Sequence, residues 1–313
     1  ALSLDYIYPA ARGTSTRPLP DGFPLEHDYS NLYHPVRLGF VQEYAVSLDF
    51  LREKDFTEMM KALWRRTYDR IAEPVVPMDN ELLYRNAMKT LRDLTAEYEG
   101  SWGLTFASGL PDGEPMKVAY QFGFVGQQPN IGYQLLRYGV LYNDAEALMK
   151  GRNVIQFWVD RSLTEWGAPH IWYNPEFHDF EDRPFWVRMI GDGMEGILDA
   201  YVFCKKQGEE HPDWLAYCRT VADWLLRAQN ADGSWYRSYD KNGEMLMESK
   251  ANTSNVIRFL IQFSLVTGEE AYQKSAIRAG EWSLANITLH LEYRGGTCDN
   301  SDIYDKESGI YAM

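Results

Sequence analysis

The chain has 313 residues, enough to bury a large core in one long domain or two ordinary ones. Its 45% hydrophobic and 24% charged residues exclude general disorder, and its net charge of −14 argues against nucleic acid or an anionic membrane surface as the main partner. No apolar run approaches the length of a membrane span. Aromatic residues make up 14% of the chain, a high share that suits ring-rich packing or sugar stacking.

The N-terminal part of the chain shows a change of pattern. Residues 1–36 are rich in Pro, Gly, Tyr and Asp and lack periodicity, so we expect an extended arm or the remnant of a preceding domain. Helical periodicity fills 37–52, Asp55 caps a second helix that runs to about residue 72, and a third runs over about 79–98. The following stretch, 100–121, is predicted to be a long loop with short strands.

From Gly126 a helical hairpin recurs at a period of about sixty residues. The helices are predicted at 129–142 and 144–163, at 188–206 and 211–228, and at 252–267 and 269–286. One hairpin cannot bury its apolar face alone, so the repeat predicts an all-α fold, an (α/α)6 toroid over 37–313. The chain stops within the first turns of a further helix, so we expect the toroid to be truncated at its C-terminus.

Long loops alternate with short turns in this pattern. The loops 164–186 and 229–251 then gather over one face of the toroid, and that face is where we expect the site. The segment QNADGSW, with Gln229, Asp232 and Trp235, resembles the Q-x-x-D-G-x-W signature that ends outer helices in several helical toroid families. These families include six-hairpin glycosidases and triterpene cyclases, but the DxDD-type run that a cyclase needs does not occur in this sequence. We predict a structural role for this segment.

Two acids open the second inner helix, in MIGDGMEGILDAY. Asp192 and Glu195 are three residues apart, so both project from nearly one face, either as ordinary helix-start carboxylates or into the central cleft. Ile190, Asp192 and Met194 approximately match an I-x-D-x-x-M-like context. Here the chain resembles the six-hairpin glycosidase superfamily, notably the unsaturated glucuronyl and rhamnogalacturonyl hydrolases. The matching Asp in that family is general acid and base on an enol-ether bond, so the resemblance implies this role for Asp192.

A second carboxylate is expected near the C-terminus. Glycosidic hydrolysis commonly uses two carboxylates, and Asp302 or Asp305 is the predicted partner of Asp192. Glu307 follows in the same acidic segment and is a predicted substrate-binding residue. Capping of a helix is the ordinary alternative role for these acids. A calcium-binding loop would use similar spacing, but the segment lacks the EF-hand pattern and its sixth-position Gly.

The loop 167–188 carries the densest set of chemical groups. His170 or His178 with Tyr173 could supply the base and acid of a polysaccharide lyase that eliminates across a uronate. Solvated loop side chains are the plain alternative, and the histidine spacing fits no helix-based metal motif. The predicted substrate-binding residues of this loop are Trp172, Glu176, His178 and Arg188.

Amide side chains stand at two further helix starts. GFVGQQPN, which ends in Asn130, places Gln127 and Gln128 before the first inner helix, and Asn252 precedes the third. Amide side chains at these positions either cap the helix or bind sugar hydroxyls. Gln127, Gln128 and Asn252 are therefore predicted substrate-binding residues, and so is Glu195. Lys250 or Arg258 could receive a ligand carboxylate.

These observations predict a glycoside hydrolase acting on oligosaccharides, including those that contain uronic acid. The alternatives are a polysaccharide lyase and a non-catalytic sugar-binding toroid. No organic cofactor is predicted. No metal is predicted either, because the three cysteines form no CxxC pair and show no metal-ligand spacing. We expect Cys204 and Cys218 to be buried as small apolar residues. The resemblance implies a periplasmic or extracellular protein, and the oligomeric state stays open.

Overall fold

The computed structural model describes residues 11–12, 30–31, 38–41, 43, 50–71, 77–105, 107–108, 115–117, 119–124, 126–295, 304 and 306–312. The chain divides into two compact units, Ala1–Val76 and Pro77–Met313. The domain boundary expected after residue 36 stays a prediction.

The first unit contains one described helix and one strand pair. β1 (Ala11–Arg12) pairs antiparallel with β2 (Ser30–Asn31), and α1 spans Phe56–Ile71. Asp55 caps α1 as predicted, accepting a hydrogen bond of 2.9 Å from the Glu58 amide. The helix expected over 37–52 is not found at the described residues 38–41, 43 and 50–52. Leu38, Val41 and Phe50 are exposed, so these three apolar side chains do not supply the packing that holds a short helix.

The second unit begins with a helix that ends sooner than its pattern predicts. α2 spans Asn80–Leu94, and the next four residues form β3 (Thr95–Tyr98), paired with β4 (Ser101–Leu104). The Thr95 hydroxyl donates to the Leu91 carbonyl at 2.7 Å, and Glu99 and Gly100 both adopt positive φ in the turn. β5 (Ala107–Ser108) pairs with β6 (Pro115–Lys117), so the short strands expected in this region are confirmed.

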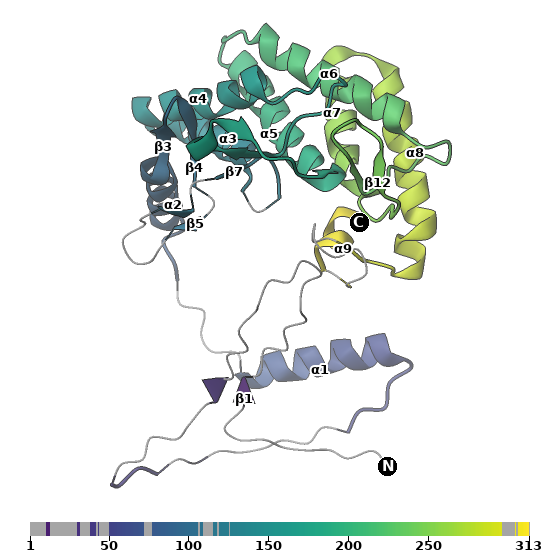
Figure 1. Cartoon of the computed structure of the whole chain (residues 1–313). Coiled ribbons are helices and arrows are strands. Elements are labelled where there is room, and N and C mark those ends of the chain that lie inside the picture. Colours follow the sequence, from purple (N-terminus) through teal and green to yellow (C-terminus); the bar gives the residue numbers. More distant parts are fainter. Residues whose placement is uncertain are drawn as a thin grey trace. The chain divides into compact units, whose positions relative to one another are not determined.

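Six helices build the toroid wall, and their bounds follow the predicted hairpins closely (Figure 1). They are α3 (Gln128–Tyr142), α4 (Ala145–Arg161), α5 (Val187–Lys206), α6 (Pro212–Ala228), α7 (Ile257–Thr267) and α8 (Glu270–Asn286). α5 packs against α3 and α7 on the inner side, whereas α6 contacts α4 and α8 on the outer side. This inner and outer pairing confirms the α/α toroid. The third inner helix starts later than expected because Thr253–Val256 form a 3₁₀ turn, η2.

Segments that connect the helices pair in two small sheets. β7 (Tyr120–Gln121), β8 (Trp172–Asn174) and β9 (Asp179–Phe180) form one sheet, with η1 (Pro175–Phe177) between the last two strands. β10 (Phe185–Trp186), β11 (Ser238–Tyr239) and β12 (Met245–Met247) form the other. Because β10 and β11 come from different long loops, their pairing confirms that the two loops lie together. η3 (Thr288–His290) and α9 (Lys306–Ala312) follow α8.

The QNADGSW segment has the structural role that its pattern predicts. Gln229 Nε2 donates to the carbonyls of Gly233 and Ser275 at 2.8 and 2.9 Å. Asp232 accepts from the Ser234 amide at 3.0 Å, and the Trp235 side chain is fully buried with its Nε1 bonded to the Leu225 carbonyl. These contacts close the end of α6 against α8.

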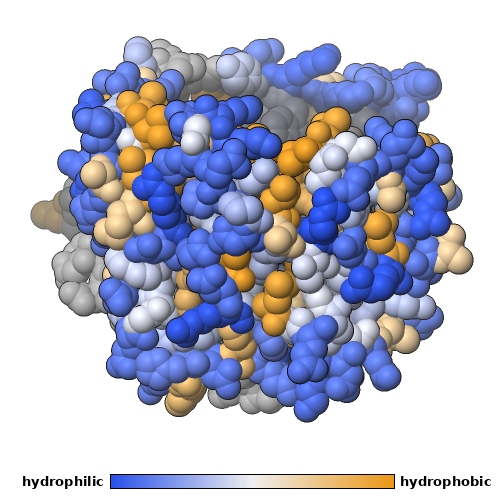
Figure 2. All heavy atoms as spheres, turned by 90° about the horizontal axis from the view of Figure 1, so that it is seen from above, coloured by the Kyte–Doolittle hydropathy of each residue, from blue (hydrophilic) through white to orange (hydrophobic). Residues whose placement is uncertain are grey.

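The core of the second unit is rich in rings, and Cys204 and Cys218 are buried in it as expected. The face drawn in Figure 2 is mostly hydrophilic, with apolar residues in separate groups. Within the described ranges, none of the helices combines the length and the apolar character needed to cross a membrane.

Candidate active site

Asp192 lies in the second turn of α5, and its carboxylate is held by the start of α3. The residue is 4% exposed. Gln127 Nε2 donates to Asp192 Oδ2 at 3.3 Å, while Asn130 Nδ2 donates both to the Asp192 backbone carbonyl at 2.9 Å and to Gln127 Oε1. The Asn130 bond orients the Gln127 amide, because the oxygen is taken and the NH₂ group must face the carboxylate.

Gln127 achieves this position in a left-handed backbone conformation, with φ of 47°. Such a conformation costs a non-glycine residue of the order of 1 kcal/mol and persists only where the surroundings enforce it. The backbone N–H of Gln127 donates to the Gly123 carbonyl at 2.9 Å, and the backbone carbonyl of Gln127 accepts from the Ile131 N–H at 2.9 Å. The strained residue therefore sits within a bonded turn that aims its side chain at Asp192.

The glycines around Asp192 allow three helix starts to converge. A Cβ atom on Gly191 would collide with the Asn255 carbonyl oxygen, just before α7. A Cβ atom on Gly196 would lie 2.5 Å from the Asn130 amide nitrogen at the start of α3. The GDGMEG sequence thus reflects close packing of α5 between its two inner neighbours, with the acid at the centre.

Arg188 joins Asp192 to the C-terminal segment. Its Nε lies 3.8 Å from Asp192 Oδ2, and its Nη2 lies 2.6 Å from Glu307 Oε2 on α9. The guanidinium also stands 3.9 Å from the centroid of the Phe124 ring and is buried. Glu307 is partly open, with its side chain 38% exposed. One buried cation therefore faces two carboxylates, one enclosed and one reached by solvent.

Glu195, one turn further along α5, makes a bridge to α7. Its carboxylate binds Arg258, which also contacts Asp199 Oδ2 at 2.9 Å. Burial raises the pKa of Glu195, and the positive charge of Arg258 acts in the opposite direction. Arg258 was a candidate to receive a ligand carboxylate, but it already faces two carboxylates of the protein. Lys250, the other candidate, is likewise paired, with Asp232 at 2.7 Å.

Two of the predicted amide ligands are engaged by the backbone. Gln128 is buried, donates to the Leu104 carbonyl at 2.6 Å and accepts from the Leu104 amide at 3.0 Å. Asn252 is buried and donates to the Gly295 carbonyl at 3.1 Å. These contacts give both side chains a role in holding β4 and the 295 loop.

The candidate lyase residues lie in and beside the β7–β8–β9 sheet. Tyr173 is buried, stacks on Tyr120 at 6.1 Å between centroids and meets the Phe157 ring edge-on at 4.8 Å. The His170 ring stacks on Phe180 at 4.8 Å, and burial lowers its pKa. Both rings are thus packing elements of an aromatic layer.

The remaining predicted residues are placed as follows. Trp172 is buried beneath the Arg183 guanidinium, at 5.2 Å from the ring centroid. Glu176 is exposed, and His178 is exposed with its Nε2 2.8 Å from Glu99 Oε2. Asp302 and Asp305 lie outside the described residues, so Glu307 is the one predicted acid of that segment that can be located.

Two contributors were not among the predicted site residues, Asn130 and Phe124. Both belong to the GFVGQQPN phrase that opens the first regular hairpin, which contained the available signal. Their contacts, to Asp192 and to Arg188, depend on helices that lie about sixty residues apart in the sequence and could not be read from spacing.

Known structures share this fold. A possible member of the GH105 family from Salmonella enterica superposes with a TM-score of 0.58 at 12% identity, over 82% of this chain and 75% of that one. A possible GH105 member from Klebsiella pneumoniae gives 0.56 at 13% identity, over 82% and 74%. The cellobiose 2-epimerase from Bacillus thermoamylovorans gives 0.54 at 12% identity, over 64% of this chain and about half, 53%, of the epimerase.

The comparison confirms the (α/α)6 toroid fold expected from the hairpin repeat. Comparison of the sequence with protein-family models and with curated proteins finds no match. The likeness at this identity is one of fold, and the chemistry must be argued from the residues of this chain.

Proposed function

We propose that this protein is a carbohydrate-active enzyme, a glycoside hydrolase that cleaves oligosaccharides by carboxylate acid and base catalysis. The observation that carries the proposal is the group formed by Asp192, Arg188 and Glu307, in which one buried guanidinium faces two carboxylates at the inner-helix starts. The fold it shares with possible GH105 members supports the same class of reaction.

The separation of the two carboxylates supports hydrolysis. Because a single guanidinium contacts both, an oxygen of Asp192 and an oxygen of Glu307 are at most about 9 Å apart, which does not exceed the carboxylate separations of glycosidase pairs. Asp302 and Asp305 stay candidates for the second carboxylate, and Glu307 joins them.

In the proposed reaction Asp192 gives a proton to the glycosidic or enol-ether bond and takes one back from the attacking water. The carboxylate left after the first step faces two donors, the Gln127 amide and the Arg188 guanidinium, which stabilise the negative charge that develops there. Glu307 or a neighbouring acid orients the water. A uronic-acid-containing oligosaccharide is the proposed substrate, and the periplasm or the exterior the proposed location.

The test is turnover on a panel of oligosaccharides, with and without unsaturated uronyl ends, by wild type and two matched variants. Asp192→Asn should lower kcat by about 10²- to 10⁴-fold, the range for loss of a general acid. Asp199→Asn, on the same helix but paired with Arg258, should keep wild-type kcat within a few-fold.

Other outcomes would assign the site differently. Full activity of Asp192→Asn together with inactive His170→Ala would identify a lyase, and so would a new unsaturated product absorbing in the ultraviolet. Binding of glycans without turnover of any of them would identify a sugar-binding toroid.

A further inference from the structure

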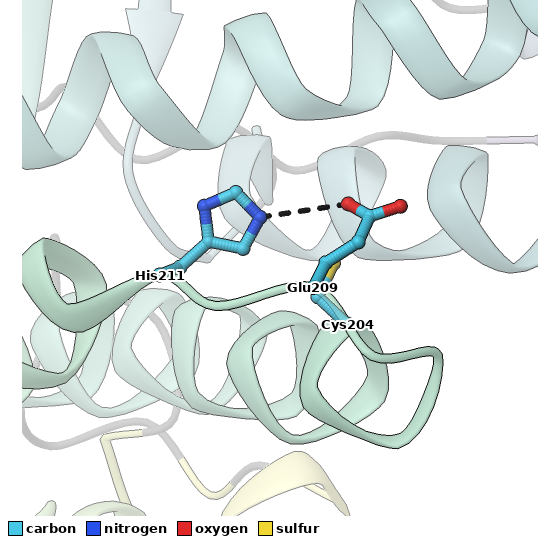
Figure 3. Close-up of side chains that lie close together, drawn as sticks. All are labelled: Cys204, Glu209 and His211. Atoms are coloured by element: carbon cyan, nitrogen blue, oxygen red, sulfur yellow. Dashed lines mark ion pairs between the residues drawn. The ribbon is translucent and has the colours of Figure 1, made fainter.

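A second group of reactive side chains lies at the opposite end of α5, on the turn that leads into α6. Cys204, Glu209 and His211 each offer one atom that a metal ion can bind, and these three atoms lie within 4.8 Å of one another. In Figure 3 the imidazole and the carboxylate face each other, with the sulfur of Cys204 behind the glutamate. A thiol, a carboxylate and an imidazole are together the ligand types that zinc accepts.

The imidazole of His211 is held in place with a buried nitrogen. Its ring stacks on Trp214 at 3.8 Å between centroids and 12° between planes, and the Trp214 Nε1 is fixed by Gln156 Oε1 at 2.8 Å. His211 Nε2 is buried without a hydrogen-bond partner among the described residues, 3.6 Å from Glu209 Oε2. A buried polar atom without a hydrogen bond is unfavourable by about 1–3 kcal/mol, and an ion bound between His211 and Glu209 would satisfy it.

Glu209 is oriented by a residue behind it. Arg152 on α4 donates to both carboxylate oxygens, at 2.6 and 3.1 Å, and holds the pKa of Glu209 below its ordinary value. Each oxygen keeps a further lone pair, and metal-bound carboxylates are commonly hydrogen-bonded in this way by an outer partner. The Glu209 amide also donates to the Cys204 carbonyl at 3.0 Å, so the turn keeps glutamate and thiol adjacent.

We propose that Cys204, Glu209 and His211 bind a Zn²⁺ ion, with solvent in the fourth position. Tetrahedral zinc places such ligand atoms about 3.3–3.7 Å apart, so the group must contract by roughly 1 Å. Gly208, with φ of 83°, lies in the turn that would adjust. The Glu209 side chain is 38% exposed and gives the ion and its water a path from solvent.

Binding involves no redox change. Cys204 is buried and enters the reaction as a thiol. A sulfur–zinc bond forms, and the thiol proton leaves to solvent. The C-terminal end of α5 favours the cation, because the last carbonyls of a helix carry a partial negative charge.

This site is separate from the proposed active site and does not depend on the proposed function. Cys204 follows Asp192 by twelve positions along α5, ~18 Å along the helix axis. The ion would tie the end of α5 to the start of α6 and, through Arg152, to α4. We therefore assign it a structural role.

The experiment uses the full chain, treated with chelator and titrated with Co²⁺ in place of Zn²⁺. We expect a thiolate-to-cobalt band in the near ultraviolet and tetrahedral bands in the visible, saturating at one ion per chain and displaced by Zn²⁺. Cys204→Ala should abolish the thiolate band. The matched control is Cys218→Ala, since Cys218 is equally buried on α6 but is not part of the ligand group, and it should keep the band.

His211→Ala and Glu209→Gln should each weaken Co²⁺ binding by at least tenfold. These two positions are partly exposed, so they report on the site even if Cys204→Ala does not fold. The proposal is overturned if no thiolate band appears at one equivalent of Co²⁺. It is also overturned if the band survives in Cys204→Ala, if His211→Ala binds Co²⁺ with wild-type affinity, or if Cys298→Ser removes the band.

Discussion

Replacing Gln127 by glycine should separate stability from activity at the proposed active site. Gln127 is a non-glycine residue at φ of 47°, so glycine relieves its backbone strain, while the amide that contacts Asp192 is lost. The gain of roughly 1 kcal/mol in the left-handed conformation offsets part of two losses, one long hydrogen bond to a carboxylate, of about 1.5 kcal/mol, and the greater entropy of unfolded glycine. We expect a free energy of unfolding within about 1 kcal/mol of wild type, which corresponds to about 2 °C in Tm.

Activity should respond much more than stability. A hydrogen bond to a charged group contributes about 1.5–3 kcal/mol, and the 3.3 Å distance places this one at the lower end. That energy corresponds to about a tenfold fall in kcat if the bond strengthens in the transition state. The assay is thermal denaturation together with steady-state kinetics on the best oligosaccharide of the panel.

Asn143 supplies the matched control, because it is also left-handed, with φ of 55°, but caps the far end of α3. Asn143→Gly should leave both kcat and KM unchanged. The reasoning is refuted if Gln127→Gly retains wild-type kcat, or if it lowers Tm by several degrees more than Asn143→Gly does.

Three further substitutions probe the surrounding structure. Arg188→Met should lower the free energy of unfolding by about 3–5 kcal/mol in urea titration, because it removes a buried guanidinium from the Asp192 and Glu307 carboxylates. Lys274→Met, which breaks an ion pair with Glu270 that is exposed on both sides, should lower it by about 1 kcal/mol or less, and equal losses would contradict this. Gly196→Ala should lower the free energy of unfolding by about 1–3 kcal/mol through overpacking, whereas Gly280→Ala, with open space around it, should be neutral or stabilising. A Gly196→Ala variant as stable as wild type would show that the helices do not pack as described. Lys250 holds the pKa of Asp232 below its ordinary value. The contribution of this ion pair to the free energy of unfolding is therefore present above about pH 4 and is lost on acidification. Wild type should therefore lose stability more steeply between pH 5 and pH 3 than Asp232→Asn, as measured by urea denaturation at the two pH values, and parallel losses would rule out this linkage.

The helices of the toroid could be predicted because each one repeats its apolar positions at the helical period. α5 and α6 begin and end within one residue of the predicted bounds. The pattern was less informative where local bonds compete with it. Residues 95–98 continue a helical pattern but pair as β3, since Thr95 closes the helix and the turn at Glu99 and Gly100 favours a hairpin.

The site could be predicted only in part. Asp192 stood out because an acid in an otherwise small and apolar helix start is unusual, and the structure places it where three helix starts meet. Gln128 and Tyr173 are predicted site residues, yet the backbone engages the side chain of Gln128 and an aromatic layer encloses that of Tyr173. Residue type alone cannot distinguish a structural side chain from a ligand-binding one, because burial and hydrogen-bond partners depend on segments far away in the sequence.

The group formed by Cys204, Glu209 and His211 could not be predicted from the sequence. The spacing of Cys204, Glu209 and His211 fits no familiar metal motif, and the sequence predicted no zinc site. A helix end followed by a short turn folds the three side chains to one place, and only the tertiary structure shows it.

The sequence by itself determined the hairpin repeat, the toroid and the position of one acid on an inner helix, because these follow from local periodicity and from capping chemistry. Tertiary structure decided which groups face that acid. Gly191 and Gly196 allow the neighbouring helix starts to approach, and Arg188 then reaches Glu307, a residue 119 positions away. Contacts of this kind depend on side-chain packing between distant segments, which no local pattern encodes.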